Sequence, residues 1–527
     1  MSGNIFQKGI RFYEKYGIRG GIATLIGKGQ IKDKDYAAWY KKHKVTESKL
    51  ECQRKQVFSF SPTISILVPV YNTPEKFLKD MIESVRNQSY EKWQLCIANA
   101  NPSNRDVKRI LTMYSEIDDR IQIVYVQDNL GIAENTNQAL KIATGDYIAF
   151  LDHDDVLASN ALYEVIKCLN VEQKPDVIYT NEDKITIDGE KHYQPNFKPE
   201  FNLDLLRANN YICHFFVVKK KIADEIGGLK SDYNGAQDYD FIFRCTERAE
   251  KIVRIPKILY HWRMHQNSTA ENPESKLYAF EAGKKAIEDH LKRCEENATV
   301  SMTEFPGFFK VEYLLSKKLD ISVIIIEKKH CEISMDIINK LLHDYGRDNM
   351  EIIIVRTEPK KIVSDNVKVL LWNKRYNESA MLNYGIEHSK GQYTILLSAK
   401  SENIGKNYLE ELVANIVRDK VAVVGGKVYY KNRTIKNAGI YITNDNQMIE
   451  PFKKLPQKCI GYMNRQSLQQ EVCAVISDNM IIDKQMWEKA GGFDERLEKI
   501  EKDLQFCKKI QELGCKIIYN PDAEIIL

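Results

Sequence analysis

A cluster of carboxylates follows one short apolar run of the sequence. Residues 147–151 are apolar or aromatic, which is typical of a parallel strand covered on both faces. Asp152, Asp154 and Asp155 come directly after this run, and carboxylates so close together stay ionised only beside a cation or in open water. Such oxygen-rich clusters suit Mg²⁺ or Mn²⁺, with a phosphate completing the coordination shell. An acidic turn that caps a helix expected near Ser159 is the alternative, and the cluster alone does not decide.

The elements around this cluster predict an α/β fold. From Ser61 onward, strand-like runs at 64–70, 94–98, 121–126 and 147–151 alternate with helix-like stretches ending near 88, 117 and 143. This alternation favours a parallel sheet with helices on both faces. Ligands of such sheets gather beyond the carboxyl ends of the strands. The polar residues expected at these ends are Tyr71, Asn72, Asn99, Asp128 and the Asp152 cluster.

Size and composition exclude several classes of protein. A chain of 527 residues can form two or three domains, each with a full core. Its net charge of +4 is too small to indicate nucleic acid as a partner, and no basic block is interleaved with aromatic residues. No GxGxxG motif follows the first strand, which weighs against a nicotinamide or flavin enzyme.

Cysteines and apolar runs indicate the compartment. The 11 cysteines are scattered without a CxxC pair, which fits a reducing compartment better than a disulfide scaffold. The first residues lack the apolar core of a signal peptide, and no apolar run has the length of a membrane span. We therefore expect a cytoplasmic protein, with contact at the inner face of the cell membrane left open.

The N-terminal segment, residues 1–60, is expected to be helical. Phe6, Lys8, Arg11, Phe12 and Lys15 mix basic and aromatic side chains at helical spacing. A helix lying on an anionic bilayer would have this pattern. A solvated helical hairpin packed on the next domain is the other interpretation.

Several short motifs occur in a fixed order between Val68 and His265. They are Val68-Pro69-Val70-Tyr71-Asn72, Asn129-Leu130-Gly131-Ile132-Ala133 with Asn137, the stretch from Gly145 to Asp155, Thr180-Asn181-Glu182-Asp183-Lys184, Gly227-Gly228-Leu229, Gly235-Ala236-Gln237-Asp238-Tyr239-Asp240 and Tyr260-His261-Trp262-Arg263-Met264-His265. Each motif alone is weak, but the shared order and spacing resemble glycosyltransferase family 2. This resemblance implies an inverting enzyme with the GT-A fold, a Rossmann-like α/β architecture with a mostly parallel sheet, and a nucleotide-sugar donor.

The resemblance also implies roles for individual residues. Asp152-His153-Asp154 becomes the DxD motif, with Asp152, Asp154 and His265 around Mn²⁺ or Mg²⁺. The same comparison implies Asp238 as the base that accepts the proton of the acceptor hydroxyl, whereas Asp240 caps or holds its helix. The residues implied for donor binding are Pro69, Tyr71, Asn72, Asn99, Asp128, Gly131, Asn137, Asp152, His153 and Arg263.

Acceptor binding and the nucleotide are less constrained. Position alone suggests Glu182, Asp183, Asn210 and His214 on the acceptor side, with burial at the sheet edge as the alternative for each. Family members usually carry an acidic residue after the second strand, where this chain has Asn99. Because an amide both donates and accepts hydrogen bonds, a pyrimidine can still be recognised. The choice between UDP and dTDP stays open.

The pattern restarts at Leu319. Residues 391–397 repeat residues 145–151 in register, but Ser398, Ala399, Lys400 and Ser401 stand where the first copy has Asp152 to Asp155. Since an ammonium group cannot ligate a metal, we expect a second GT-A-like domain that kept its fold and lost its metal site. A metal-free mechanism using Lys400 is the alternative, and Asp503 is the counterpart of Asp238, either as a base or as a helix cap.

The expected organisation is an N-terminal segment at 1–60, a catalytic domain at 61–295, a connector at 296–318 and the second domain at 319–527. The expected function is metal-dependent transfer of a sugar to a glycan or lipid-linked acceptor during synthesis of a bacterial surface polysaccharide, a context that comes from the resemblance alone. Two active domains, or a non-catalytic glycan-binding scaffold, are the alternatives. A homo-oligomer is compatible with the sequence, which does not reveal the oligomeric state.

Overall fold

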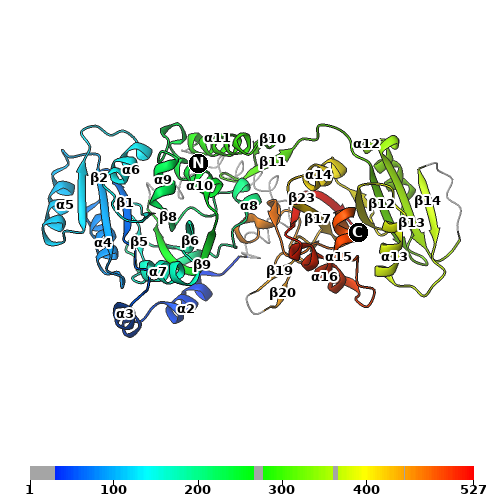
Figure 1. Cartoon of the computed structure of the whole chain (residues 1–527), viewed down its shortest axis with the longest axis horizontal. Coiled ribbons are helices and arrows are strands. Elements are labelled where there is room, and N and C mark those ends of the chain that lie inside the picture. The colour runs from blue at the N-terminus through cyan, green and yellow to red at the C-terminus, as the bar shows by residue number, and fades with distance from the viewer. Residues whose placement is uncertain (1–29, 266–276, 360–365, 444–445) are drawn as a thin grey trace, which may run out of the picture.

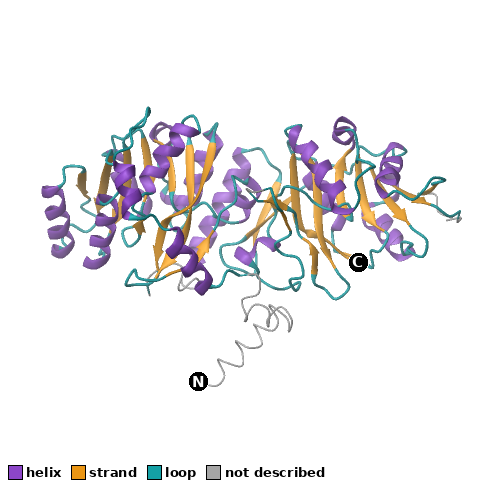
Figure 2. Cartoon of the chain, turned by 90° about the horizontal axis from the view of Figure 1, so that it is seen from below, coloured by secondary structure: helices purple, strands orange, loops and turns teal. Residues whose placement is uncertain are grey.

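The protein consists of two large α/β domains that lie side by side along its longest axis (Figure 1). The computed structural model describes residues 30–265, 277–359, 366–443 and 446–527. The basic and aromatic helix predicted around Phe6 to Lys15 lies outside the described residues. Figure 2 shows the strands of each domain surrounded by helices, as the alternating sequence pattern predicts.

The first domain is built on a nine-stranded mixed sheet, with strand order β3-β2-β1-β4-β8-β6-β9-β5 and β7 paired with β6. The strands are β1 (Ile64–Val70), β2 (Trp93–Asn99), β3 (Ile121–Tyr125), β4 (Tyr147–Phe150), β5 (Val156–Leu157), β6 (Val177–Ile185), β7 (His192–Asn196), β8 (Phe216–Lys219) and β9 (Ile252–Arg263). The helices are α4 (Glu75–Arg86), α5 (Arg105–Ile117), α6 (Ile132–Lys141), α7 (Ala161–Val171), α8 (Leu203–Ala208), α9 (Lys220–Glu225), α10 (Gln237–Arg248) and α11 (Leu277–Arg293).

Apolar side chains of β1 point alternately to the two faces of the sheet, and each face is covered by an apolar core. Ile64, Ile66 and Val68 belong to the apolar core on one face, whereas Leu67 belongs to the core on the other. This is the period of two that a strand imposes on its side chains. Strands β3, β2, β1 and β4 run parallel, so their carboxyl ends open at one edge. β8 enters antiparallel beside β4, which the sequence pattern did not predict.

The second domain repeats this topology in a ten-stranded sheet, with order β14-β13-β12-β15-β22-β17-β23-β16. Its main strands are β12 (Ile321–Glu327), β13 (Met350–Arg356), β14 (Val367–Leu371), β15 (Tyr393–Ser398), β16 (Asn403–Ile404), β17 (Val421–Tyr429), β18 (Ile435–Asn437), β21 (Gln470–Glu471), β22 (Asn479–Asp483) and β23 (Lys516–Ile526). Its helices are α12 (Met335–Tyr345), α13 (Glu378–Glu387), α14 (Tyr408–Ile416), α15 (Lys484–Ala490) and α16 (Lys499–Glu512), and β19 (Tyr441–Ile442) and β20 (Met448–Ile449) form a separate ribbon.

Register identifies the two domains as copies. Ile64 of β1 pairs with Tyr147 of β4, and Ile321 of β12 pairs with Tyr393 of β15. Both central strands therefore begin opposite the first residue of their neighbour. The internal repeat predicted from residues 145–151 and 391–397 is confirmed at the level of strand pairing.

A hairpin of β10 (Ala298–Met302) and β11 (Phe309–Tyr313) lies between the domains (Figure 1). Direct contacts also cross the boundary. Arg418 donates to both carboxylate oxygens of Asp204, at 2.7 and 3.1 Å, and the apolar core beside α10 extends to Ala414 and Leu468 of the second domain. Because the interface contains a buried ion pair as well as apolar packing, the domains form one continuous body.

Two short helices, α2 (Asp33–His43) and α3 (Glu47–Arg54), precede the first sheet. Tyr36 of α2 is buried and donates its hydroxyl to Asp183 of β6 at 2.6 Å. The described part of the N-terminal segment thus packs on the first domain. Among the described residues, no helix is both long and apolar enough to cross a membrane.

Candidate active site of the first domain

The carboxylate cluster lies between the end of β4 and the short strand β5. Asp155 is buried and accepts hydrogen bonds from the Tyr260 hydroxyl at 2.5 Å and from the Arg263 backbone N–H at 2.7 Å. Burial, followed by the nearby charges of Asp154 and Asp152, raises the pKa of Asp155 well above its usual value. Asp155 therefore anchors the loop to β9 from the inside.

Asp154 is paired with the histidine that ends the last motif. His265 Nε2 and Asp154 Oδ2 are 2.7 Å apart, and their side chains are 15% and 19% exposed. Arg263 braces this loop, because its Nε donates to the Asp154 carbonyl at 2.9 Å and its Nη2 pairs with Asp80 at 3.0 Å. The pairing of Asp154 with His265 joins residues 111 positions apart in the sequence.

Asp152 faces the histidine that was expected on the acceptor side. His214 Nε2 lies 3.7 Å from Asp152 Oδ2, and the imidazole stacks on Tyr260 with ring centroids 4.6 Å apart. The Asp152 side chain is 42% exposed. Asp152, Asp155 and His214 each offer one ligand atom within 4.8 Å of the others. A donor set of carboxylate oxygens and imidazole nitrogens is chemically able to hold a divalent cation.

A cavity of about 630 Å³ opens beside these groups, within the size range of ligand sites in proteins, roughly 300–1,000 Å³. Six of the residues predicted for the site line it: Pro69, Gly131, Asp152, Asn210, His214 and Asp238. Its other walls are largely apolar and include Phe150, Phe241, Trp262, Tyr278 and Phe309. Phe150 and Trp262 lie within motifs of the sequence, whereas Tyr278 and Phe309 belong to no motif and could not be predicted to line the site.

Asp238 stands in the first turn of α10, where the N-terminal end of a helix favours a negative charge. Asn210 Nδ2 donates to Asp238 Oδ2 at 2.8 Å, and the Cys213 thiol lies 3.6 Å from the same oxygen. Asp240 instead is fully buried and paired with Arg244 one turn later, at 2.6 Å. The two acidic residues of this motif therefore differ in exposure, and only Asp238 faces the cavity.

The remaining residues predicted for donor binding lie around the carboxyl ends of the strands but do not line the cavity. Tyr71 is 47% exposed, and Asp128 is also exposed. Asn72 Oδ1 accepts hydrogen bonds from Asn101 and Asn104. Asn99 is buried at the end of β2, and its Nδ2 has no hydrogen-bond partner within the described parts of the chain.

Of two further residues predicted for donor binding, Asn137 has a local structural role. Asn137 forms two hydrogen bonds with the backbone of Leu229, both at 2.9 Å, which fasten α6 to the Gly-Gly loop. His153 Nδ1 lies 3.9 Å from Asp154 Oδ1, too far for a hydrogen bond.

Residues 65–227 and 334–490 match the family described as glycosyl transferase family 2. Over 526 residues, the chain is 32% identical to the uncharacterized protein y4gI of Sinorhizobium fredii, covering 96% of this chain and 57% of that protein. It is 26% identical to the O-antigen biosynthesis protein RfbC of Myxococcus xanthus, covering 93% of this chain and 39% of that protein. The chain belongs to glycosyltransferase family 2. It spans little more than half the length of the first relative and less than half that of the second.

Among solved structures, S. aureus TarS 1-349 in complex with UDP matches at 18% identity over 44% of this chain and 65% of that one. The TM-score of 0.35 is too low to support a structural argument. The family match divides between the two sheets of the fold, so both domains are of family 2 type.

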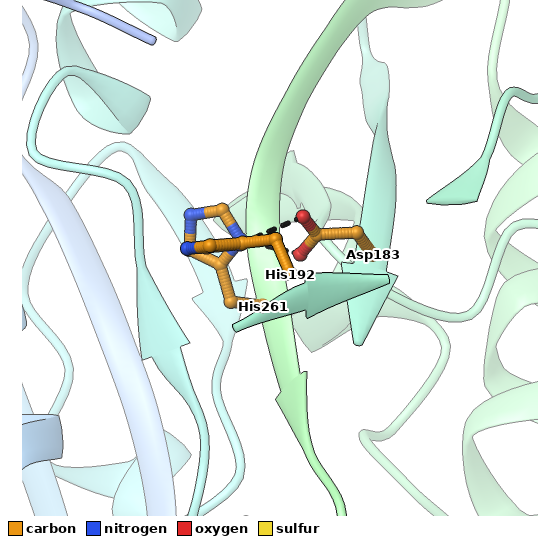
Figure 3. Close-up of side chains that lie close together, drawn as sticks. All are labelled: Asp183, His192 and His261. Atoms are coloured by element: carbon orange, nitrogen blue, oxygen red, sulfur yellow. Dashed lines mark hydrogen bonds and ion pairs between the residues drawn. The ribbon is translucent and has the colours of Figure 1, made fainter. Parts of the chain in front are cut away.

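Glu182 and Asp183, the other two residues expected on the acceptor side of this family 2 domain, are turned away from the cavity. Glu182 pairs with the buried Lys198 at 2.9 Å. Asp183 is fully buried between His192 Nδ1 at 2.8 Å and His261 Nδ1 at 2.6 Å (Figure 3). Although burial opposes it, the charges of these histidines hold the pKa of Asp183 below its usual value. Together with Tyr36, the cluster ties α2 to β6, β7 and β9.

The second family 2 domain has different chemistry at the equivalent positions. Lys400 is exposed, and the Ser401 hydroxyl donates to the Ser398 carbonyl at 2.8 Å. Asp503, the counterpart of Asp238, is buried and bound by Lys502 Nζ at 3.0 Å and by the Ser477 backbone N–H at 3.1 Å. Burial raises the pKa of Asp503 even beside this lysine. The base position of the second domain is therefore occupied by the chain's own ammonium group.

Proposed function

We propose that the first domain transfers a sugar from a nucleotide-sugar donor to a hydroxyl group of a glycan or lipid-linked acceptor, with inversion at the anomeric carbon. The observation that carries this proposal is the convergence of Asp152, Asp238 and Asn210 on one cavity, beside the pair of Asp154 and His265. Membership of glycosyltransferase family 2 supports it.

A divalent cation at the carboxylate cluster is part of this proposal. Asp152, Asp154 and His265 would hold Mn²⁺ or Mg²⁺, with His214 beside Asp152. The cation would neutralise the charge that develops on the diphosphate leaving group. Asp155 keeps the loop in place through Tyr260 and the backbone of β9.

Asp238 would act as the general base. Its Oδ2 accepts from Asn210, which orients the carboxylate toward the cavity. As the acceptor oxygen bonds to the anomeric carbon, the bond from that carbon to the diphosphate oxygen breaks, and the hydroxyl proton passes to Asp238. One displacement of this kind inverts the anomeric centre, as in inverting glycosidases.

The nucleotide and the biological context are part of the proposal. Asn99 ends β2 at the carboxyl edge of the sheet, and because an amide can pair with a pyrimidine, we propose UDP or dTDP as the carrier. RfbC takes part in O-antigen biosynthesis by its name, which favours a surface polysaccharide as the product. We infer that the second domain does not catalyse transfer, because Lys502 occupies its base position.

The test is nucleotide release from a panel of UDP- and dTDP-sugars, with Mn²⁺ or with chelator. Wild type, Asp154→Ala and the matched second-domain variant Lys400→Ala are compared. We expect metal-dependent release that Asp154→Ala abolishes and Lys400→Ala leaves unchanged. Release that survives both chelator and Asp154→Ala, but is lost in Lys400→Ala, would move catalysis to the second domain and overturn the proposal.

A further inference from the structure

A second, smaller cavity lies in the seam between the two domains. It has a volume of about 80 Å³ and is lined by residues of α8, of the β10–β11 hairpin and of the second domain. Phe309, the first residue of β11, lines both this cavity and the larger catalytic one. The two cavities are therefore neighbours on either side of one aromatic side chain.

The seam cavity combines polar and apolar walls and has a larger polar share than the mostly apolar catalytic cavity. Asp204 and Arg207 come from the first domain, Thr303 and Lys310 from the hairpin, and Gln469 and Asp522 from the second domain. Each of these three regions supplies two of the six polar groups, so the polar wall is complete only when both domains are present.

These polar groups are held in fixed orientations. Lys310 Nζ contacts Glu411 at 2.8 Å, Glu312 at 2.9 Å and Asp522 at 3.1 Å. Asp204 accepts from Arg418 and from Gln469 Nε2, each at 2.7 Å. Since cations and carboxylates already neutralise one another, the wall favours a neutral ligand with many hydroxyl groups over an ion.

We propose that this seam cavity is an acceptor subsite, which binds the hydroxyl groups of a sugar ring next to the one that receives the transferred sugar. The inference rests on the proposed function of the first domain. The volume suits this ligand, because one water needs about 10–15 Å³ of such space, and the cavity therefore accommodates the hydroxyl-bearing edge of one ring. The Asp522 side chain is 44% exposed, so the subsite opens to solvent and a longer glycan can continue outward.

The subsite gives the second domain a role that does not require its own catalysis. Gln469 and Asp522 lie on segments of the second domain that are remote from Lys400 and Asp503 in the sequence. The second domain would bind the acceptor in the seam cavity, while sugar transfer takes place in the larger cavity on the other side of Phe309. A glycan with two or more sugars would then be a better acceptor than a single sugar.

The test measures acceptor length dependence with the full chain. The probes are reducing-end-labelled mono-, di- and trisaccharides, prepared by partial hydrolysis of the surface polysaccharide of the source cell. Wild type is compared with Asp522→Asn, with Ser467→Leu, which fills the cavity from a second position in its wall, and with Glu402→Gln. Glu402 is a matched control, because its side chain is 48% exposed and paired with Lys431 at 2.6 Å away from the seam.

We expect wild type to prefer the di- and trisaccharide over the monosaccharide in kcat/KM. Loss of one charged hydrogen bond corresponds to about a tenfold change in binding, so both seam variants should raise KM for the longer acceptors about tenfold more than for the monosaccharide. Glu402→Gln should leave the length dependence intact. A loss of activity through misfolding would lower transfer to all lengths together.

Two outcomes overturn separate claims. Transfer by wild type with no length preference, or seam variants that keep the full preference, would overturn the subsite and leave the proposed function standing. Absence of nucleotide release and transfer from every donor and acceptor in the wild type would overturn the proposed function, and with it the subsite.

Discussion

The two domains share their strand order and differ at the ends of their strands. The first places Asp152, Asp154 and Asp155 after its central strand β4, and the second has Ser398 as the last residue of β15, followed by Lys400 and Ser401. Both central strands nevertheless pair with their neighbours in the same register. The fold thus depends on buried apolar strands, whereas the chemistry depends on a few side chains at the strand ends that differ between the domains although the strand pairing is the same.

Two side-chain-to-backbone hydrogen-bonding arrangements occur in both domains. Ser65 and Ser322 each accept, at 2.9 Å, the N–H of the glycine that precedes the central strand. Asn137 binds Leu229 through two backbone hydrogen bonds, and Asn383 binds Phe493 in the same way, with all four distances at 2.9 Å. The second domain lacks the carboxylate cluster but keeps these hydrogen bonds, so we infer that they stabilise the fold. We therefore interpret Asn137 as a structural residue, although its motif implied donor binding.

The largest expected effect is a difference in transfer rate between variants of Asp238 and of its counterpart Asp503. Asp238→Asn should lower the transfer rate about 10²- to 10⁴-fold, the usual contribution of general base catalysis, while nucleotide-sugar binding persists. Asp503→Asn should leave transfer unchanged, since Lys502 already occupies that carboxylate. Steady-state transfer and donor binding by calorimetry measure the two effects. Near-normal transfer by Asp238→Asn, or a comparable loss in Asp503→Asn, would contradict the assignment of catalysis to the first domain.

The next effect concerns the contact between the domains. Burial alone would raise the pKa of Asp204, but the neighbouring Arg418 lowers this pKa to about 2. Because this folded-state pKa lies below the ordinary value of about 3.9, the pair stabilises the fold fully above that value, and its contribution is lost as pH falls toward 2. Asp204→Ala should cost about 3–5 kcal/mol at pH 7, as expected when one partner of a buried pair is removed. The difference from wild type should shrink below about pH 4.

Urea unfolding at a series of pH values measures this difference. Glu402→Gln is the control, because an exposed ion pair contributes at most about 1 kcal/mol. If Asp204→Ala and Glu402→Gln lowered the free energy of unfolding equally, the buried pair of Asp204 and Arg418 would not stabilise the contact between the domains.

The smallest effect tests the hydrogen-bonding arrangements that both domains share. Asn137→Ala and Asn383→Ala each remove two backbone hydrogen bonds, so each should destabilise its own domain by about 1–3 kcal/mol. The two losses should be similar, as measured by thermal unfolding. If Asn137→Ala instead weakened donor binding without changing stability, Asn137 would be a ligand-binding residue and the comparison with Asn383 would fail.

Much of the architecture could be predicted from local pattern. The strand predicted at residues 64–70 is β1 with the same bounds, and the helix predicted to end near residue 117 is α5, which ends at Ile117. The repeat and the altered second site were also readable, because residues 391–397 match residues 145–151 while Lys400 replaces Asp154. Such features are local in sequence, since periodicity and residue type suffice to recognise them.

The candidate site could be predicted only in part. The motif residues Asp152 and Asp238 meet at one cavity with Asn210 and His214, which were predicted from position alone. The sequence pattern did not predict that Tyr260 and Arg263 bind Asp155, that Glu182 and Asp183 turn away from the cavity, or that Phe309 of the connector closes its wall. The contacts of Asp155 join residues more than a hundred positions apart. The orientations of Glu182 and Asp183 depend on partners such as Lys198 and His261, which no motif links to them.

The amino-acid sequence by itself determined the family, the doubled α/β architecture and the loss of the second carboxylate cluster, because periodicity and residue identity are properties of short segments. The tertiary structure determines which polar side chains face a cavity and which are paired with other groups in the interior. The reason is physical: a buried polar group must find a partner. Only the packed chain shows that Asp183 finds His192 and His261, whereas Asp238 is left facing open space.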